Sequence, residues 1–263
     1  MSQHARFRQI RLEQSPAGVT TLTLARPDTL NALNAEMVDE LRAAIAQVES
    51  SEARCLLITG DGRGFSSGAD LQSGGGLPED AGEALEKHFN PLIEALFDLP
   101  IPVVAAVNGP AAGAGCSIAL AADIVVAARS AYFLQAFVNI GLIPDAGATW
   151  LLPRLAGRAR AMEMMMLGER VSAEQALSWG LISRVVDDEH VASESVLLAT
   201  QLAAGPTVAL ALIRKLARSA QDLILSEALA SERAAQREAG RTEDFKSAVA
   251  AFLEKRQPLF RGR

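Results

Sequence analysis

The stretch of residues 99–122 carries no charged side chain, and it restricts the fold of this chain more than any other segment. An uncharged run of this length is either a membrane-spanning helix or the buried centre of a domain. Prolines and glycines interrupt it at Pro100, Pro102, Gly109, Pro110, Gly113 and Gly115. Because these residues break a continuous helix, we expect a buried strand at 102–107, a tight turn at 108–115 and a helix at 113–122.

Similar short apolar segments occur elsewhere in the chain and alternate with amphipathic ones. Segments 19–25, 55–59 and 123–128 have the apolar, β-branched composition of strands. Segments 35–49 and 80–99 place their apolar side chains at helical spacing. Short buried strands that alternate with helices predict an α/β fold with a largely parallel sheet.

The composition argues against several classes of function. The chain has 263 residues, 49% of them hydrophobic, which suffices for one large domain with or without an appendage. A net charge of −6 argues against binding to nucleic acid or to an anionic membrane. Two isolated cysteines and an N-terminus without an apolar signal segment predict a cytoplasmic protein. The three histidines lack metal-ligand spacing, so we expect no metal site.

The composition changes from about residue 191 onward. No strand-like segment follows, and Ala, Leu, Glu, Arg and Lys predominate. We therefore expect a core at residues 1–195 and a helical region at residues 196–263, with a break at Gly205-Pro206. The apolar stripe of Val208, Leu212 and Leu216 is too extensive for a free surface, and it predicts packing on the core or on a second subunit.

Two loops combine small residues with the end of a predicted strand. FSSGAD at 65–70 follows the 55–59 strand and begins a Gly/Ser-rich loop, and GPAAGAG at 109–115 follows the 102–107 strand. If the two strands are neighbours, backbone N–H groups of both loops converge beside the start of the 113–122 helix. Fixed N–H donors of this kind form an oxyanion hole. The alternative is that both loops are tight turns whose small residues serve packing.

Asp145 is the one charged residue in the segment NIGLIPDAGATW at 139–150. A charge among apolar residues is costly unless it is paired or the chemistry requires it. Asp145 also precedes a predicted helix. It is therefore either the N-cap of that helix or a catalytic group, and the residues alone leave both roles open.

Longer motifs resemble the crotonase (enoyl-CoA hydratase/isomerase) superfamily. The resemblance covers nearly the whole chain, through ARPDTLNALN, FSSGADL, PVVAAVNGPAAGAG, IGLIPDAGATWLLPRLAGRARAM and AFLEKRQPLF. It implies a spiral of ββα units followed by a C-terminal helical trimerisation region, which would assemble a homotrimer or a dimer of trimers. It also implies an acyl-CoA thioester as substrate, with CoA as part of that substrate and no separate cofactor.

The resemblance assigns expected roles to individual residues. Backbone N–H groups that polarise the thioester carbonyl fall at Ala69 and Ala114. Arg26 lies where the family contacts CoA. Phe252 and Lys255 resemble C-terminal residues that reach the CoA of a neighbouring subunit. For these last three residues, ordinary packing or a solvated charge is the alternative.

The departures from the family pattern bear on the reaction. Hydratases of the family use two glutamates, and this chain has Ser117 and Phe137 at those positions. The pair of carboxylates that would activate one water for hydration is therefore missing. Isomerase branches of the family instead place a single carboxylate at or near the position of Asp145. The motifs are most similar to the branch that isomerises ring epoxides of phenylacetyl-CoA. An acyl pocket would be lined by Phe137, Leu142, Trp150 and Asn90, and its apolar members would raise the pKa of Asp145.

Other functions stay open. In the aryl-CoA dehalogenase branch an aspartate at this position attacks an aromatic ring with help from a histidine, but Asn90 occupies the corresponding position here and His88 lies two residues earlier. A hydratase-like enzyme acting on another acyl-CoA is a second alternative. A CoA-binding scaffold without activity is the third, since a fold alone does not guarantee catalysis.

Overall fold

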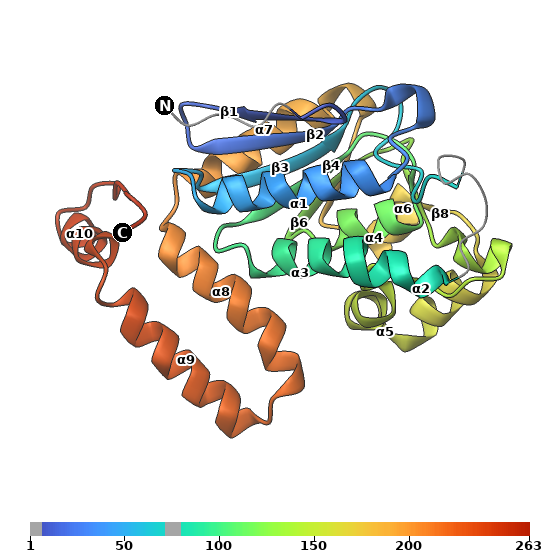
Figure 1. The fold of residues 1–263 in the computed structure, drawn as a ribbon. Helices are drawn as coiled ribbons and strands as arrows, with labels where there is room; N and C mark the ends of the chain where they lie inside the picture. The colour runs from blue at the N-terminus through green and yellow to red at the C-terminus, as the bar shows by residue number, and fades with distance from the viewer. Residues whose placement is uncertain (1–6, 72–79) are drawn as a thin grey trace.

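The computed structural model describes residues 7–71 and 80–263, and a six-stranded sheet forms its centre (Figure 1). In spatial order its strands are β1 (Ile10–Gln14), β2 (Val19–Leu24), β3 (Cys55–Gly60), β4 (Val103–Val107), β6 (Ile124–Ala128) and β9 (Arg184–Val186). β1 pairs antiparallel with β2, and all other neighbours are parallel. The largely parallel α/β sheet predicted from the sequence is confirmed.

A second, smaller sheet contains three short strands, β5 (Ala111–Ala112), β7 (Tyr132–Leu134) and β8 (Val171–Ser172). β5 arises from the small-residue segment 109–115 and pairs parallel with β7. The sequence did not predict these strands, because two or three residues are too few to show an alternating pattern.

Helices cover the sheets, and several of them contact one another directly. They are α1 (Ala35–Glu49), α2 (Ala81–Ala84), α3 (Asn90–Asp98), α4 (Ala114–Leu120), α5 (Ala148–Leu167), α6 (Ala173–Ser178), α7 (Val191–Ala203), α8 (Thr207–Ser219), α9 (Leu225–Ala239) and α10 (Glu243–Leu253). α1 and α3 contact each other in front of the large sheet in Figure 1. Asn34 caps α1, since its side-chain oxygen accepts the Met37 N–H at 2.8 Å.

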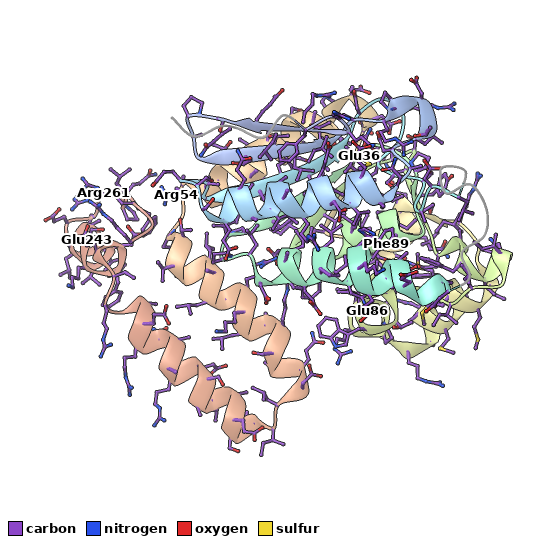
Figure 2. All side chains as sticks on the ribbon, in the orientation of Figure 1. Glu36, Arg54, Glu86, Phe89, Glu243 and Arg261 are labelled. Carbon is purple, nitrogen blue, oxygen red and sulfur yellow. The ribbon has the colours of Figure 1, made fainter. Side chains whose placement is uncertain are left out.

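The helix predicted at 80–99 continues from α2 into α3 but contains a π-helical turn at Leu85–Phe89. Figure 2 shows Phe89 on the side that faces α1, where it is buried, and Glu86 on the side that points away. Turns of this type are frequent at functional sites because they redirect the side chains around them. This one immediately precedes Asn90.

The uncharged stretch 99–122 is buried core, as predicted. It forms β4, β5 and α4, and every residue of these three elements is buried. In the part of the chain that the structure describes, no single helix is long and apolar enough to cross a membrane. Only the pair Asp188–Ala203 and Thr207–Asp222 has that length and composition, and its two members are bent by 107°. The predicted Gly/Ser-rich loop lies outside the described residues beyond residue 71.

The predicted boundary at residue 195/196 falls inside α7, and the division into two regions stays a prediction. α7 packs against β3, β4 and β6 through a stripe that includes Val191, Leu198 and Ala203. After it, α8, α9 and α10 extend away from the sheet in Figure 1. An Ala/Leu-rich helix has the same composition whether it packs on its own sheet or on another subunit.

Arg214, which is 7% exposed, joins α8 to the core. Its Nε lies 2.7 and 2.9 Å from the two carboxylate oxygens of Asp123. Its remaining nitrogens donate to the carbonyl oxygens of Leu96, Phe97 and Leu99 at the end of α3. A cation at this end of a helix is stabilised by the helix dipole. The orientation of α8 is thus fixed relative to α3.

Candidate active site

The two small-residue loops meet at one edge of the large sheet. β3 leads into the loop at 65–70 and β4 leads into the loop at 109–115, and these strands are parallel neighbours. Parallel strands present their carboxyl ends at the same edge. Ser66 forms a bridge with Ala111, and the Ala112 N–H donates to the Ser66 carbonyl at 2.8 Å. The predicted contact between the loops is therefore present.

Gly68 and Gly113 lie where the loops approach most closely. Gly68 has a φ of +88°, and a Cβ on it would lie 2.8 Å from the Ala112 carbonyl oxygen and 3.3 Å from the Gly113 Cα. Gly113 has a φ of +51°. Any side chain at Gly68 would push the loops apart. The residues that follow these glycines, Ala69 and Ala114, are consequently brought together.

Neither the Ala69 nor the Ala114 N–H donates to a backbone oxygen of the described residues. Leu33 holds the peptide groups that flank Ala69: its N–H donates to the Gly68 carbonyl at 2.8 Å and its carbonyl accepts the Asp70 N–H at 2.9 Å. Successive peptide groups of an extended segment point in opposite directions, so the Ala69 N–H points away from Leu33. Ala114 is the first residue of α4, where N–H groups have no intrahelical acceptor. Two such donors can serve as an oxyanion hole.

Asp145 does not cap the helix that follows it. α5 begins at Ala148, its N-cap is Gly147, and no side chain caps it. Asp145 instead opens a tight turn in which its carbonyl oxygen accepts the Ala148 N–H at 3.0 Å. The helix-cap alternative is therefore wrong, and the carboxyl group is left for another role.

The Asp145 carboxyl group lies in a poorly solvated position. Its Oδ1 is buried and has no hydrogen-bond partner among residues 7–71 and 80–263. Burial raises the pKa of the Asp145 carboxyl to about 6, because the anion loses hydration. A carboxyl group with a pKa near the working pH can both accept and return a proton, as a general acid–base catalyst must.

Two elements hold the Asp145 turn in place. On one side, the hydroxyl of Ser117 in α4 donates to the Asp145 carbonyl oxygen at 3.1 Å. On the other, Gly147 lies against Ile93 of α3, whose Cγ2 is 3.5 Å from the position of a Cβ on that glycine. Neither contact was predicted: Ile93 had no expected site role, and Ser117 was expected only to replace a glutamate. Such contacts join segments that are distant in sequence, so no local sequence pattern predicts them.

Three of the four residues predicted for the acyl pocket belong to segments next to the Gly113 loop or to α3, and their role in an acyl pocket stays a prediction. Phe137 is buried, and its ring is 3.7 Å from the position of a Cβ on Gly113, the residue before Ala114. The Leu142 N–H donates to the Phe137 carbonyl at 2.9 Å, and its side chain is 44% exposed. Asn90 is exposed one helical turn before Ile93.

Trp150, the fourth residue predicted for the acyl pocket, packs between α5 and α8, and its role in an acyl pocket stays a prediction. Its ring packs edge-to-face on Phe97 with centroids 5.7 Å apart, and the Arg154 guanidinium lies 4.1 Å from its centroid. It lines a cavity of about 430 Å³ between α5 and α8, together with Ile213.

Arg26 is tied to the loop that carries Ala69. Its guanidinium lies 2.9 Å from the Asp70 carboxylate and also donates to the Ala32 carbonyl oxygen. Both charged side chains are largely buried, so the ion pair links the segment of Arg26 to the loop that carries Ala69. A contact between Arg26 and CoA stays a prediction.

Phe252 and Lys255 lie far from Asp145 within one chain. Both are at the end of α10, which Figure 1 places on the opposite side of the molecule from α2 and α5. Phe252 is 81% exposed. A role for these residues in binding CoA therefore requires the active site of another subunit.

His88 does not support the dehalogenase-like alternative. Its Nδ1 lies 2.9 Å from the Asp39 carboxylate of α1, so the imidazole is engaged there.

Over the described ranges, no three His, Cys, Asp or Glu side chains are grouped as metal ligands.

Comparison with known proteins identifies the family. Residues 14–263 match the enoyl-CoA hydratase/isomerase family. The chain is 51% identical to a 1,2-epoxyphenylacetyl-CoA isomerase of Escherichia coli, over 94% of this chain and 96% of that protein. It is 46% identical to a probable enoyl-CoA hydratase of Rhodobacter capsulatus, over 98% and 99% of the two chains. An enoyl-CoA hydratase crystal structure from Polaromonas sp. JS666 superimposes with a TM-score of 0.89 at 37% identity, over 96% and 99%. The chain is therefore an enzyme of the enoyl-CoA hydratase/isomerase family, within the crotonase superfamily.

Proposed function

We propose that this enzyme is an acyl-CoA isomerase that shifts a Δ3 double bond to Δ2 in a CoA thioester, with Asp145 as its single base. One observation carries the proposal. A buried carboxyl oxygen without a partner among the described residues belongs to a turn held against α4, the helix that begins with Ala114. A proton acceptor and one candidate oxyanion donor, the Ala114 N–H, are thereby attached to the same helix.

The proposed reaction moves one proton and leaves the atoms of the substrate otherwise unchanged. The Asp145 carboxylate removes a proton from the carbon next to the thioester carbonyl. The electron pair of that C–H bond forms a dienolate, whose oxygen accepts hydrogen bonds from the N–H groups of Ala69 and Ala114. The protonated Asp145 then returns the proton two carbons away, and the double bond ends conjugated with the thioester.

Hydration is disfavoured by the two side chains at the family's glutamate positions. Ser117 directs its hydroxyl to a backbone carbonyl, and Phe137 fills its position with an apolar ring. Neither can remove a proton from water. Because a probable enoyl-CoA hydratase is among the relatives, hydration should be measured alongside isomerisation.

An aromatic-sized acyl group, as in the ring-epoxide/oxepin form of phenylacetyl-CoA, is the substrate that we propose. The oxepin has the same composition as the epoxide, with the ring C–C bond of the epoxide broken, and it carries the Δ3 double bond that the proton shift moves to Δ2. Phe137 beside the oxyanion turn would pack on such a ring. The relative named 1,2-epoxyphenylacetyl-CoA isomerase supports the same substrate class. We propose that Arg26, and Phe252 and Lys255 from a neighbouring subunit, contact the CoA part, and that no separate cofactor takes part.

We further propose that the enzyme assembles as a homotrimer or a dimer of trimers. The exposed apolar side chains of α8, α9 and α10 include Ile213, Leu229 and Phe245, at 62%, 53% and 51% exposure. Exposed apolar area of this extent favours packing on a second copy. Light scattering is expected to show a mass that is a multiple of three chains, and a monomer would contradict the assembly.

Proton–deuterium exchange is the direct test of the chemistry. In D2O, the enzyme is expected to incorporate deuterium at the α and γ carbons of a 3-enoyl-CoA and to release the Δ2 product. Enoyl-CoA, 3-enoyl-CoA and ring-epoxide thioesters should be compared at equal concentration. Asp145→Asn is expected to lose the exchange while still binding the thioester. Exchange that survives in this variant would exclude Asp145 as the base.

A further inference from the structure

The position of the Asp145 carboxyl group depends on its backbone. Its Oδ1 has no hydrogen-bond partner among the described residues, so no bond at that atom fixes the side chain. The turn itself is strained at Ala146, which has a positive φ of +48°, whereas Gly147 adopts its φ of +80° without strain. Alanine rarely adopts this conformation, and a strained turn persists only where its surroundings hold it.

Ser117 supplies a contact that holds the turn from outside. The residue is 1% exposed, and its Oγ is 3.1 Å from the Asp145 carbonyl oxygen. Its other acceptor, the Gly113 carbonyl at 3.4 Å, already receives the Ser117 N–H at 3.2 Å. The Asp145 carbonyl likewise receives one backbone donor, the Ala148 N–H at 3.0 Å. A hydroxyl has one proton to donate, and the shorter distance, 3.1 Å against 3.4 Å, favours Asp145 as its acceptor.

This hydrogen bond joins the two halves of the proposed catalytic machinery. Ser117 lies one helical turn after Gly113 and Ala114, on the helix whose first N–H would hold the dienolate oxygen. Asp145 would remove a proton from the α carbon, which is next to the thioester carbon that carries this oxygen. Proton transfer requires both groups to hold their relative positions closely.

We propose that Ser117 is a positioning residue whose hydroxyl fixes the backbone of Asp145 relative to the oxyanion hole. The inference rests on the isomerase function proposed above. Hydratases carry a catalytic glutamate at the position of Ser117. In this chain the serine at that position would instead hold Asp145, the base of a different reaction, in place. Ser117 touches no reacting atom in this role.

Ser117→Ala tests the proposal, with Ser195→Ala as its matched control. Ser195 is a fully buried serine of α7 whose Oγ has no partner in the described part of the chain. Loss of the Ser117 hydroxyl is expected to lower kcat for isomerisation about tenfold, with KM changed less than about twofold. Ser195→Ala is expected to leave both unchanged. Ser117→Cys, which is nearly isosteric and a weaker donor, is expected to lie between wild type and Ser117→Ala.

A double variant separates positioning from stability. If Ser117 acts through Asp145, adding Ser117→Ala to Asp145→Asn is expected to cause no further loss of rate. An unchanged kcat in Ser117→Ala, an equal loss in Ser195→Ala, or additive losses in the double variant would overturn the proposal. If Ser117→Ala does not fold, Ser117→Cys decides by the same criteria. Full activity in Asp145→Asn would instead overturn the proposed function itself.

Discussion

Replacing Asp145 by asparagine should make the protein more stable at neutral pH while removing its activity. The carboxyl group has a pKa of about 6 in the folded chain and an ordinary value near 3.8 when exposed. Between these pH values the folded state binds more protons than the unfolded state. The free energy of unfolding therefore falls as the pH rises through this window, and the loss is complete above the folded-state pKa.

The size of the effect follows from the pKa. Each pKa unit corresponds to about 1.4 kcal/mol, so a rise from 3.8 to about 6 destabilises the ionised protein by about 3 kcal/mol. Asparagine has no charge to bury. It introduces an amide with its own unsatisfied groups, and that cost does not depend on pH. The informative quantity is thus the change in the stability difference between variant and wild type with pH.

Urea unfolding at one fixed protein concentration measures this quantity. Between about pH 4 and about pH 8, the stability of Asp145→Asn relative to wild type is expected to rise by about 2.4 kcal/mol, because an exposed carboxyl is already partly ionised at pH 4. In the same series, wild-type isomerisation is expected to rise through about pH 6 as the base loses its proton, and the variant is expected to be slower by about 10²–10⁴-fold.

A stability difference that stays constant with pH would refute the raised pKa. Turnover by Asp145→Asn comparable to wild type would refute the single-base mechanism, whatever the stability data show. Glu86→Gln, which removes an exposed carboxylate within the π-turn, is the control and is expected to leave the rate unchanged.

Three further substitutions test the parts that support the site. Gly68→Ala places a Cβ 2.8 Å from a backbone carbonyl of the opposite loop, so isomerisation is expected to fall about 10²-fold in a kinetic assay. Phe137→Ala leaves a cavity beside Gly113, and urea unfolding is expected to show a loss of about 3 kcal/mol, with a raised KM for aromatic thioesters. Asp123→Asn leaves the buried Arg214 without its carboxylate, and the free energy of unfolding is expected to fall by about 3 kcal/mol in the same assay. An unchanged urea midpoint would show that this ion pair does not hold α8 in place.

The fold could be predicted wherever the hydrophobic pattern is local. β2, β3, β4 and β6 are long enough to be read from their apolar, β-branched side chains, and α1 from its spacing and its Asn34 cap. The strands of two or three residues, the π-turn before Asn90 and the packing of α7 depend on partners distant in sequence. No propensity encodes them, so they were not predicted.

The site was predictable to the same extent. Glycines at Gly68 and Gly113 indicated where two backbones would approach, and Asp145 stood out as a lone charge in an apolar segment. The direction of a side chain after a turn could not be predicted, and neither could the packing of Trp150 in the cavity between α5 and α8. The ion pair of Arg26 with Asp70 likewise joins segments that only the folded chain brings together.

The stability cost of Asp145 itself bears on its function. An unpaired carboxylate in an apolar turn lowers stability at neutral pH, and asparagine at the same place would avoid that penalty. The strained Ala146 beside it adds a second cost. Neither feature helps the helix that follows, because Gly147 is its cap. Two local penalties that bring no structural benefit are typical of a catalytic group, and they favour a base at Asp145 over a CoA-binding protein without activity.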